Sequence, residues 1–348
     1  MRLVQEPRRY RSLIQTSSDN SSSEIFMLPI AVDAMGGDFA PSQIVAGALQ
    51  AAELGIPVVL VGPEDLEGRG NLELIVASEV IEMDDDPAYG VRRKKDSTLV
   101  RAAEAVRDGK ASAMISAGNT GATMASALLL MGRINNVNRP AIATPIPVPG
   151  GRPTVLLDAG ANAEVVAEWL VQFAIMGSVY SHHRYGVENP RVGLLSIGEE
   201  PGKGDSLRKE AFELLSNASG INFIGNVEGR DVMSDNVDVV VTDGFTGNVV
   251  LKTLEGGMKT LIKALMAAFA AKEEYKPHAD ALFPALLPLY DSVDPESTGG
   301  AILLGVDGVC IISHGSSSAR AMVNGIKVAS DMVQCGMVEE IRRAINGE

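Results

Sequence analysis

One pattern recurs along this sequence and limits what the chain can fold into. A short apolar run ends in Asp or Ser, a glycine-containing polar loop follows, and a segment with helical spacing then begins. The runs are residues 29–33, 113–116, 155–158, 192–196, 237–243 and 309–313. Apolar strands that alternate with amphipathic helices are typical of βαβ units, in which helices cover both faces of a mostly parallel sheet. The sequence therefore predicts an α/β protein.

The loops that follow these strands are expected to form the binding site. In a parallel sheet every strand-to-helix loop lies at the carboxyl edge, where ligands bind. Glycine lets backbone N–H groups approach a ligand, and each loop opens a helix whose N-terminus carries partial positive charge. One such loop alone is as well explained by a tight turn. Six of them favour a single edge that binds phosphate or another oxyanion.

Charge and composition narrow the classes of partner. The 348 residues include 30 Lys and Arg against 44 Asp and Glu, so the formal net charge is −14. Because this mean field repels nucleic acid, no nucleic-acid partner is expected, and an anionic ligand needs a local site. Two cysteines, Cys310 and Cys335, fit a reducing cytosol rather than a disulfide framework. The sequence contains no run of 18 apolar residues, so no membrane span is predicted.

The signatures of several other enzyme classes are absent from the sequence. No G-x-G-x-x-G follows the first strand, and in GEEPGKGDS (198–206) a glycine follows the lysine where a Walker loop has Ser or Thr. There is no G-x-S-x-G elbow. Cys310 lies in the apolar run VCII and is predicted to be an inert core thiol. His182 and His183 lie on different faces of a helical segment, so a metal site is not predicted.

Eight blocks of sequence, taken in order, resemble one family. They are IAVDAMGGDFAP (30–41), RRKKDS (92–97), ISAGNTGATMA (115–125), LLDAGAN (156–162), NPRVGLLSIGEEPGKGD (189–205), INFIGNVEGRD (221–231), DGFTGNVVLKTLEG (243–256) and HGSSSARA (314–321). From about residue 29 to residue 333 the chain resembles the phosphate acyltransferases of bacterial phospholipid synthesis. Residues 1–28 have no place in the family pattern, and residues 258–297 are only loosely similar to it.

The resemblance implies a reaction. A fatty acyl group passes from acyl-[acyl carrier protein] to inorganic phosphate, which gives acyl phosphate for phosphatidic acid and phospholipid synthesis. The alternative is a phosphotransacetylase-type enzyme that acts on acyl-coenzyme A thioesters. The resemblance also implies a three-layer α/β/α fold like those of isocitrate dehydrogenase and the phosphotransacetylases. No metal and no organic cofactor is implied.

The resemblance further implies partners and a location. A homodimer is expected, in a cytoplasmic enzyme that associates peripherally with the membrane and passes its product to the glycerol-phosphate acyltransferase of the next step. Residues 1–28, which hold four Arg and a Ser/Asn-rich tract, are predicted to be a disordered extension, with a targeting arm as the alternative. Residues 29–348 are predicted to form the catalytic domain. Its helical hairpin at about 254–298 is expected to contact a dimer partner or the membrane.

The implied chemistry gives the loop residues candidate roles. A phosphate oxygen attacks a thioester carbonyl, so the site must hold a dianion and stabilise an oxyanion. The candidate catalytic residues are Asp33, Lys203, Asp243 and His314; Lys203 would pair with phosphate, and the others would orient it or protonate the leaving thiolate. An Asp at a strand end is often only a helix cap, and which loop holds phosphate stays open. The predicted substrate-binding residues are Gly36, Gly37, Asp38, Ser116, Asn119, Thr120, Gly121, Asn162, Gly204, Thr246, Asn248, Ser316, Ser317 and Arg320.

The densest positive run of this acidic chain is Arg92, Arg93, Lys94 and Lys95. These residues are predicted to dock the acidic carrier protein, because opposite charges steer association and fix orientation. The alternative is an ordinary solvated helix face.

Overall fold

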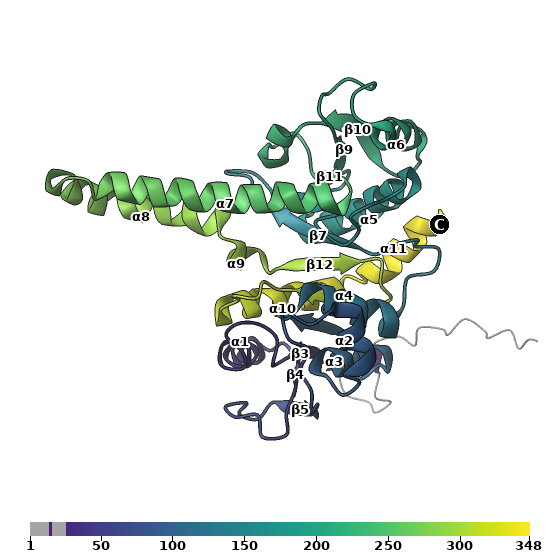
Figure 1. The fold of residues 1–348 in the computed structure, drawn as a ribbon, viewed down its shortest axis with the longest axis vertical. Helices are drawn as coiled ribbons and strands as arrows, with labels where there is room; N and C mark the ends of the chain where they lie inside the picture. The colour runs from purple at the N-terminus through teal and green to yellow at the C-terminus, as the bar shows by residue number, and fades with distance from the viewer. Residues whose placement is uncertain (1–13, 16–25) are drawn as a thin grey trace, which may run out of the picture.

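The computed structural model describes residues 14–15 and 26–348, and the fold is drawn in Figure 1. Within these residues eleven strands form one sheet, in the order β10-β9-β11-β8-β7-β12-β13-β6-β3-β4-β5. A separate two-residue pair joins β1 (Ile14–Gln15) to β2 (Phe26–Met27). The other strands are β3 (Ile30–Asp33), β4 (Val58–Gly62), β5 (Glu73–Val76), β6 (Ala113–Ser116), β7 (Ala141–Ile146), β8 (Thr154–Leu157), β9 (Arg191–Leu195), β10 (Asn222–Val227), β11 (Val239–Val241), β12 (Ala301–Leu304) and β13 (Val309–Ile312). Each apolar run singled out in the sequence contains or overlaps a strand. The predicted disorder of residues 1–28 falls largely on 1–13 and 16–25, which lie outside the described residues.

The sheet consists of two parallel blocks that run in opposite directions. Strands β8 to β11 are parallel to one another, and so are β13, β6, β3, β4 and β5. Between the blocks β7 is antiparallel to β8 and β12, and β12 is antiparallel to β13. The prediction of one carboxyl edge for all loops is therefore wrong, because each block has a carboxyl edge of its own.

Helices cover both faces of the sheet, as predicted for a three-layer α/β/α protein. Alternate strand side chains point to opposite faces: Ala113 and Ile115 of β6 join one apolar cluster, and Met114 joins the other. One face is covered by α1 (Ser42–Glu53), α5 (Ala167–Tyr185), α6 (Ser206–Asn217), α10 (Ala319–Gln334) and α11 (Met337–Asn346). The other is covered by α2 (Pro87–Arg93), α3 (Thr98–Arg107), α4 (Thr120–Ser126) and the beginning of α7 (Gly244–Phe269). Most of the strands are buried throughout. Burial on both faces explains why their sequences are uniformly apolar rather than alternating.

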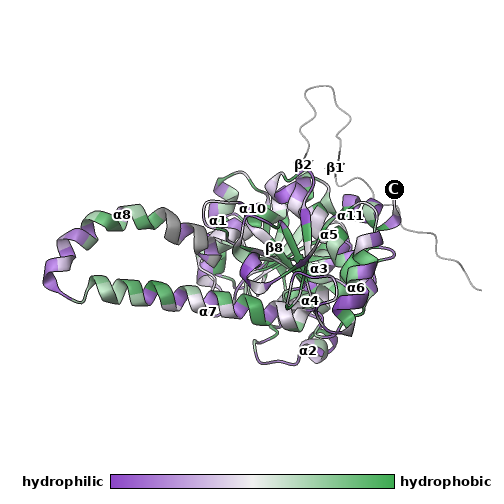
Figure 2. Ribbon diagram, turned by 90° about the horizontal axis from the view of Figure 1, so that it is seen from above, coloured by the Kyte–Doolittle hydropathy of each residue, from purple (hydrophilic) through white to green (hydrophobic). Residues whose placement is uncertain are grey.

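A long helical hairpin extends away from this body (Figures 1 and 2). Helix α7 leads outward, and α8 (Lys276–Val293) returns to the short helix α9 (Pro295–Thr298) beside α10. Several large apolar side chains of the hairpin are exposed, among them Leu261 at 70% and Leu282 at 57%. Among the described residues, no helix is both long and apolar enough to cross a membrane.

Candidate functional site

The first group of loops follows β3, β6 and β13, and a buried carboxylate organises it. The Asp33 side chain is 1% exposed and accepts hydrogen bonds from the Ser116 hydroxyl (2.7 Å) and the Met35 N–H (3.2 Å). The Ser116 oxygen in turn accepts from the N–H of Gly118 at 2.9 Å. Burial raises the pKa of Asp33, and these hydrogen bonds only partly oppose the shift. Asp33 therefore holds together the two glycine loops that follow β3 and β6.

Glycine is required where these loops meet. A Cβ on Gly36 would lie 2.6 Å from the Asp33 carboxylate and 2.7 Å from the Gly118 nitrogen. Gly37 has φ +103°, a conformation that side chains other than glycine's rarely adopt, and the N–H of Asp38 donates to the Gly315 carbonyl at 2.7 Å. The structure thus brings together three of the predicted loops at this point.

Asn119 has a structural task in this group. Its amide nitrogen donates to the carbonyls of Glu82, Met83 and Asp85 at 3.1–3.3 Å, and its oxygen accepts from Ala122 N–H at 3.0 Å, which caps α4. With all these atoms engaged, Asn119 holds the 82–85 loop against the beginning of α4. The neighbouring Thr120 is exposed, while Gly121 packs closely against Pro87.

The 314–321 segment presents some of its predicted residues and engages others. His314 is exposed, and its Nδ1 atom lies 2.8 Å from the Ser316 hydroxyl, whereas Ser317 is buried and donates to the His314 carbonyl. Arg320 pairs with Asp291 of α8 at 3.2 Å and donates to Ser297 of α9 at 2.7 Å. Its guanidinium therefore ties α10 to the returning end of the hairpin.

The second group of loops follows β8, β9 and β11, and it contains a carboxylate that the sequence analysis did not single out. Asp158 is fully buried, and its two oxygens accept from the N–H groups of Ile142, Gly160, Ala161 and Asn162 and from the Asn162 side chain. Burial is also the main reason why the pKa of Asp158 is raised. The loop 158–162 is therefore wrapped around this side chain, and the predicted residue Asn162 is part of the wrapping.

The beginning of α7 packs directly on that loop. The N–H of Gly244 donates to the Asn162 carbonyl at 2.7 Å. A Cβ on Gly247 would lie 1.9 Å from the Asp158 carbonyl oxygen, so only glycine allows this approach. The Asn248 side chain reaches the space beside Gly160.

An ion pair that the sequence analysis missed joins α6 to α7. The guanidinium of Arg208 pairs with Asp243 and, at 3.0 Å, with Asp205, and it also donates to the Thr246 hydroxyl at 3.2 Å. Burial alone would raise the pKa of Asp243, but hydrogen bonds from Thr246 and the charge of Arg208 outweigh it, so the pKa is lowered. Asp243 is both the N-cap of α7 and the partner of Arg208.

This pair predicts a difference in acid sensitivity. Asp243→Asn keeps an N-cap but loses the charge pair, and we expect it to cost about 2 kcal/mol near neutral pH, because Arg208 keeps Asp205. A carboxyl group with a lowered pKa stabilises the folded state above its unfolded pKa, and the contribution is lost as the pH falls through the lowered value. Chemical denaturation as a function of pH should show the difference at neutral pH and its loss in acid.

The control for that measurement is Asp205→Asn, which changes the same charge at the exposed partner of Arg208. Its side chain is 59% exposed, so a small effect at every pH is expected. Equal losses from the two variants would contradict the role given to Asp243.

Lys203 lies in an exposed turn of the second loop group. The N–H of Lys203 donates to the Glu200 carbonyl at 3.0 Å, which closes a turn over residues 200–203. Glu199 pairs with Arg230, and Asp205 pairs with Arg208. A lysine in such an acidic stretch could simply form a salt bridge with a neighbouring acid. Among the described residues, Lys203 forms no such salt bridge. Gly204, with φ +98°, then leads the chain into α6.

The basic run 92–95 is only partly available to a partner. Arg92, Arg93 and Lys95 are exposed, and the guanidinium of Arg93 lies over the Tyr89 ring. Lys94 instead donates to the Val80 carbonyl at 2.7 Å and pairs with Asp85. Lys94 is thus part of the local structure.

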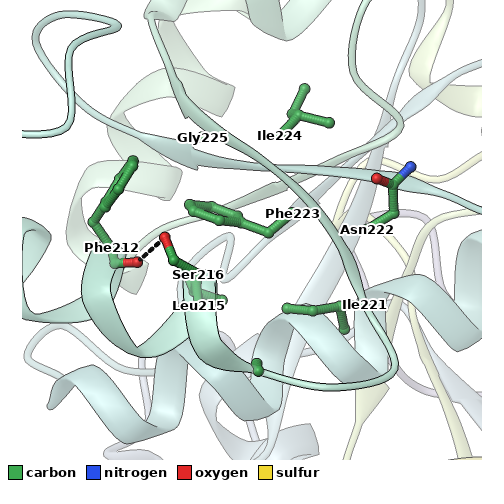
Figure 3. Close-up of a pocket in the computed structure, with 9 residues that line it drawn as sticks. Phe212, Leu215, Ser216, Ile221, Asn222, Phe223, Ile224 and Gly225 are labelled. Atoms are coloured by element: carbon green, nitrogen blue, oxygen red, sulfur yellow. Dashed lines mark hydrogen bonds between the residues drawn. The ribbon is translucent and has the colours of Figure 1, made fainter.

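Two further features lie apart from these loops. A cavity of about 390 Å³ between α6 and the edge strand β10 (Figure 3) is lined by residues such as Phe212, Ile221 and Phe223, and by none of the predicted site residues. Cys310 is fully buried, which raises the pKa of its thiol to about 12 and fits the predicted inert core cysteine. In the described part of the chain, no three His, Cys, Asp or Glu side chains form a metal-binding cluster.

The fold is shared with solved structures. The branched-chain phosphotransacylase from Enterococcus faecalis V583 is 17% identical and aligns with a TM-score of 0.58 over 88% of this chain and 99% of that chain. The EutD phosphotransacetylase from Staphylococcus aureus is 16% identical, with a TM-score of 0.57 over 88% and 94%. The predicted phosphotransacetylase-like fold is confirmed.

Sequence comparison identifies the family. A family model described as "fatty acid synthesis protein" matches residues 28–340. The phosphate acyltransferase of Pelotomaculum thermopropionicum is 48% identical over 327 residues, which cover 91% of this chain and 95% of that protein. That of Elusimicrobium minutum is 48% identical over 336 residues, with 91% and 95% covered. The chain belongs to the phosphate acyltransferase family, and the protein is an acyltransferase.

Proposed function

We propose that this enzyme transfers a fatty acyl group from acyl-[acyl carrier protein] to inorganic phosphate and so produces acyl phosphate for phospholipid synthesis. The observation that carries the proposal is the exposed Lys203 ammonium in a glycine-flanked turn. Its acidic neighbours Glu199 and Asp205 pair with arginines, and among the described residues no salt bridge joins it to Glu200. A cation that its own loop leaves available suits a small anion. The names of the close relatives support phosphate as the acceptor.

The residues of this chain fit that reaction. A phosphate oxygen attacks the thioester carbonyl, a C–O bond forms as the C–S bond breaks, and the electron pair leaves on the thiolate of the carrier. Because a substantial share of phosphate is already a dianion near neutral pH, it needs little help from a base, and the chief task is to hold it against the carbonyl. In this proposal Lys203 binds phosphate, and the thiolate takes up a proton from solvent. The predicted role of His314 as that acid is not carried into the proposal, because His314 follows β13 and Lys203 follows β9, two strands whose carboxyl ends lie at opposite edges of the sheet. The buried Asp33 and the Arg208–Asp243 pair position the loops without contacting substrate.

The choice of acyl donor is tested directly. Turnover is measured with acyl-[acyl carrier protein], with the same acyl group on coenzyme A, and with acetyl-coenzyme A, each with inorganic phosphate. We expect the carrier-protein thioester to give by far the highest kcat/KM. Equal or better use of the coenzyme A thioesters would support the phosphotransacetylase-type alternative instead.

The docking proposal for the basic run gives a prediction of its own. Arg92 and Arg93 are exposed, so changing both to Glu should raise KM for acyl carrier protein about tenfold at low salt and leave KM for phosphate nearly unchanged. The effect should weaken as salt is added, because the charges lie in water.

The matched control is Lys110→Glu, an exposed charge reversal between α3 and the beginning of β6, away from the carboxyl ends of the strands. An unchanged KM for the carrier protein in the double variant, or an equal rise in the control, would contradict docking at α2.

The hairpin is proposed to contact a second copy of the chain, in a homodimer, or the membrane surface where the glycerol-phosphate acyltransferase of the next step lies. Its exposed Leu261 and Leu282 support a covered apolar surface. Changing both to Asp should halve the mass in solution if the hairpin makes the dimer, and should abolish flotation with phospholipid vesicles if it contacts the membrane. A variant with wild-type mass and flotation would contradict both.

A further inference from the structure

The sequence block 221–231 has no part in the function proposed above, but it contacts the Lys203 turn. The block contains β10 and the beginning of a short 3₁₀ helix, Gly229–Met233, which follows the carboxyl end of β10. Strand β10 pairs in parallel with β9, and the loop that leaves β9 carries Lys203. Two side chains of the block reach that loop: Asn226 and Arg230.

The contact made by Asn226 is specific. Its side-chain nitrogen donates to the Glu200 carbonyl at 2.8 Å, and the N–H of Lys203 donates to the same carbonyl at 3.0 Å. A carbonyl oxygen has two lone pairs, and here one closes the turn while the other fastens it to the sheet. Arg230 adds an exposed ion pair to Glu199 at 3.0 Å, which contributes little by itself.

Packing alone does not explain why a polar asparagine side chain is buried at position 226. The residue is 6% exposed, and within the described residues its side-chain oxygen has no hydrogen-bond partner. The hydroxyl of Ser196, at the base of the same loop, is also buried and unpaired among them. An apolar side chain would avoid the cost of an unpaired buried oxygen but would lose the bond to Glu200.

We propose that Asn226 is a positioning residue for acyl transfer: it fastens the turn that presents Lys203. The inference rests on the proposed role of Lys203 in binding phosphate. It concerns the geometry of the turn, which can be measured without turnover.

The first test is limited proteolysis of the full-length enzyme with trypsin, which cleaves after the exposed Lys203. Asn226→Ala and Asn226→Asp should speed cleavage at this bond at least about threefold, because the turn opens more often. The matched control is Asn222→Ala on the same strand (Figure 3), whose side chain contacts the Asn189 carbonyl instead. Unchanged cleavage in both Asn226 variants would overturn the proposal.

The second test is kinetic. Both variants should lower kcat/KM for phosphate about tenfold, roughly one unit of log rate, while Asn222→Ala stays at the wild-type value. The Asp variant should regain activity relative to wild type as the pH falls from about 8 to about 6, because burial raises a carboxyl pKa and the protonated group again donates to Glu200. A merely structural defect would not recover with pH.

The outcomes separate the two proposals. Faster cleavage with wild-type phosphate kinetics, while Lys203→Ala is impaired, would overturn positioning by Asn226. Faster cleavage together with a fully active Lys203→Ala would show that Asn226 fastens the turn, and it would contradict the role of Lys203 in binding phosphate.

Discussion

Lys203→Ala is expected to lower kcat/KM for phosphate by roughly 10²–10³, a loss of about 2–4 kcal/mol in transition-state stabilisation, comparable to the removal of one oxyanion donor. The reason is electrostatic. Two of the three acidic neighbours of the ammonium, Glu199 and Asp205, are paired with Arg230 and Arg208, and among the described residues no salt bridge joins Lys203 to the third, Glu200, so a phosphate dianion is the partner proposed for it. The melting temperature should hardly change, because the side chain is exposed.

The control is Lys209→Ala, which removes another exposed lysine from the first turns of α6, six residues along the chain. We expect its phosphate kinetics to equal those of the wild type. Normal phosphate kinetics in Lys203→Ala would mean that Lys203 is an ordinary solvated charge and that this turn does not bind phosphate.

The second large effect is expected from Gly247→Ala, which should destabilise the protein by about 3 kcal/mol. The new methyl group would lie 1.9 Å from the carbonyl oxygen of Asp158, a backbone atom that cannot move without disturbing the loop wrapped around that side chain. The first turn of α7 must therefore shift. Since this turn carries Asp243 and Thr246, activity should fall with stability. Urea unfolding followed by circular dichroism measures the change.

The same helix provides the control. A Cβ on Gly256 would meet no atom within 4 Å, and alanine is the better helix former, so Gly256→Ala should raise stability by about 0.5–1 kcal/mol. If both substitutions change stability in the same direction and by similar amounts, the contact between α7 and the 158–162 loop has no special role.

The strands and the loop positions could be predicted from the sequence because both depend on local pattern. A run such as residues 113–116 is apolar throughout, and the AGNTG that follows opens α4 at Thr120 as helix-start chemistry predicts. The opposite directions of the two blocks of parallel strands could not be predicted in this way. Strand β7 has the same kind of apolar run, and nothing in its composition says that it pairs antiparallel with β8 and β12.

The candidate site was predictable in its loops but not in its contacts. Asp33 ends a strand and Asp158 and Asp243 come just after one, yet the sequence analysis did not single out Asp158 although it carries the same signal. Arg208 lies three residues after Asp205 on a helix that had no reason to be singled out, and only the fold brings it to Asp243. The engagement of Arg320 by α8 and α9 depends on where the hairpin returns, which sequence spacing does not determine.

The most direct measurement is the consumption of acyl-[acyl carrier protein] by the full-length enzyme with and without inorganic phosphate, with acyl phosphate detected as the product. The account predicts that donor loss depends on phosphate and that one acyl phosphate forms for each free carrier protein released. Donor loss without phosphate, or with free fatty acid as the product, would contradict it.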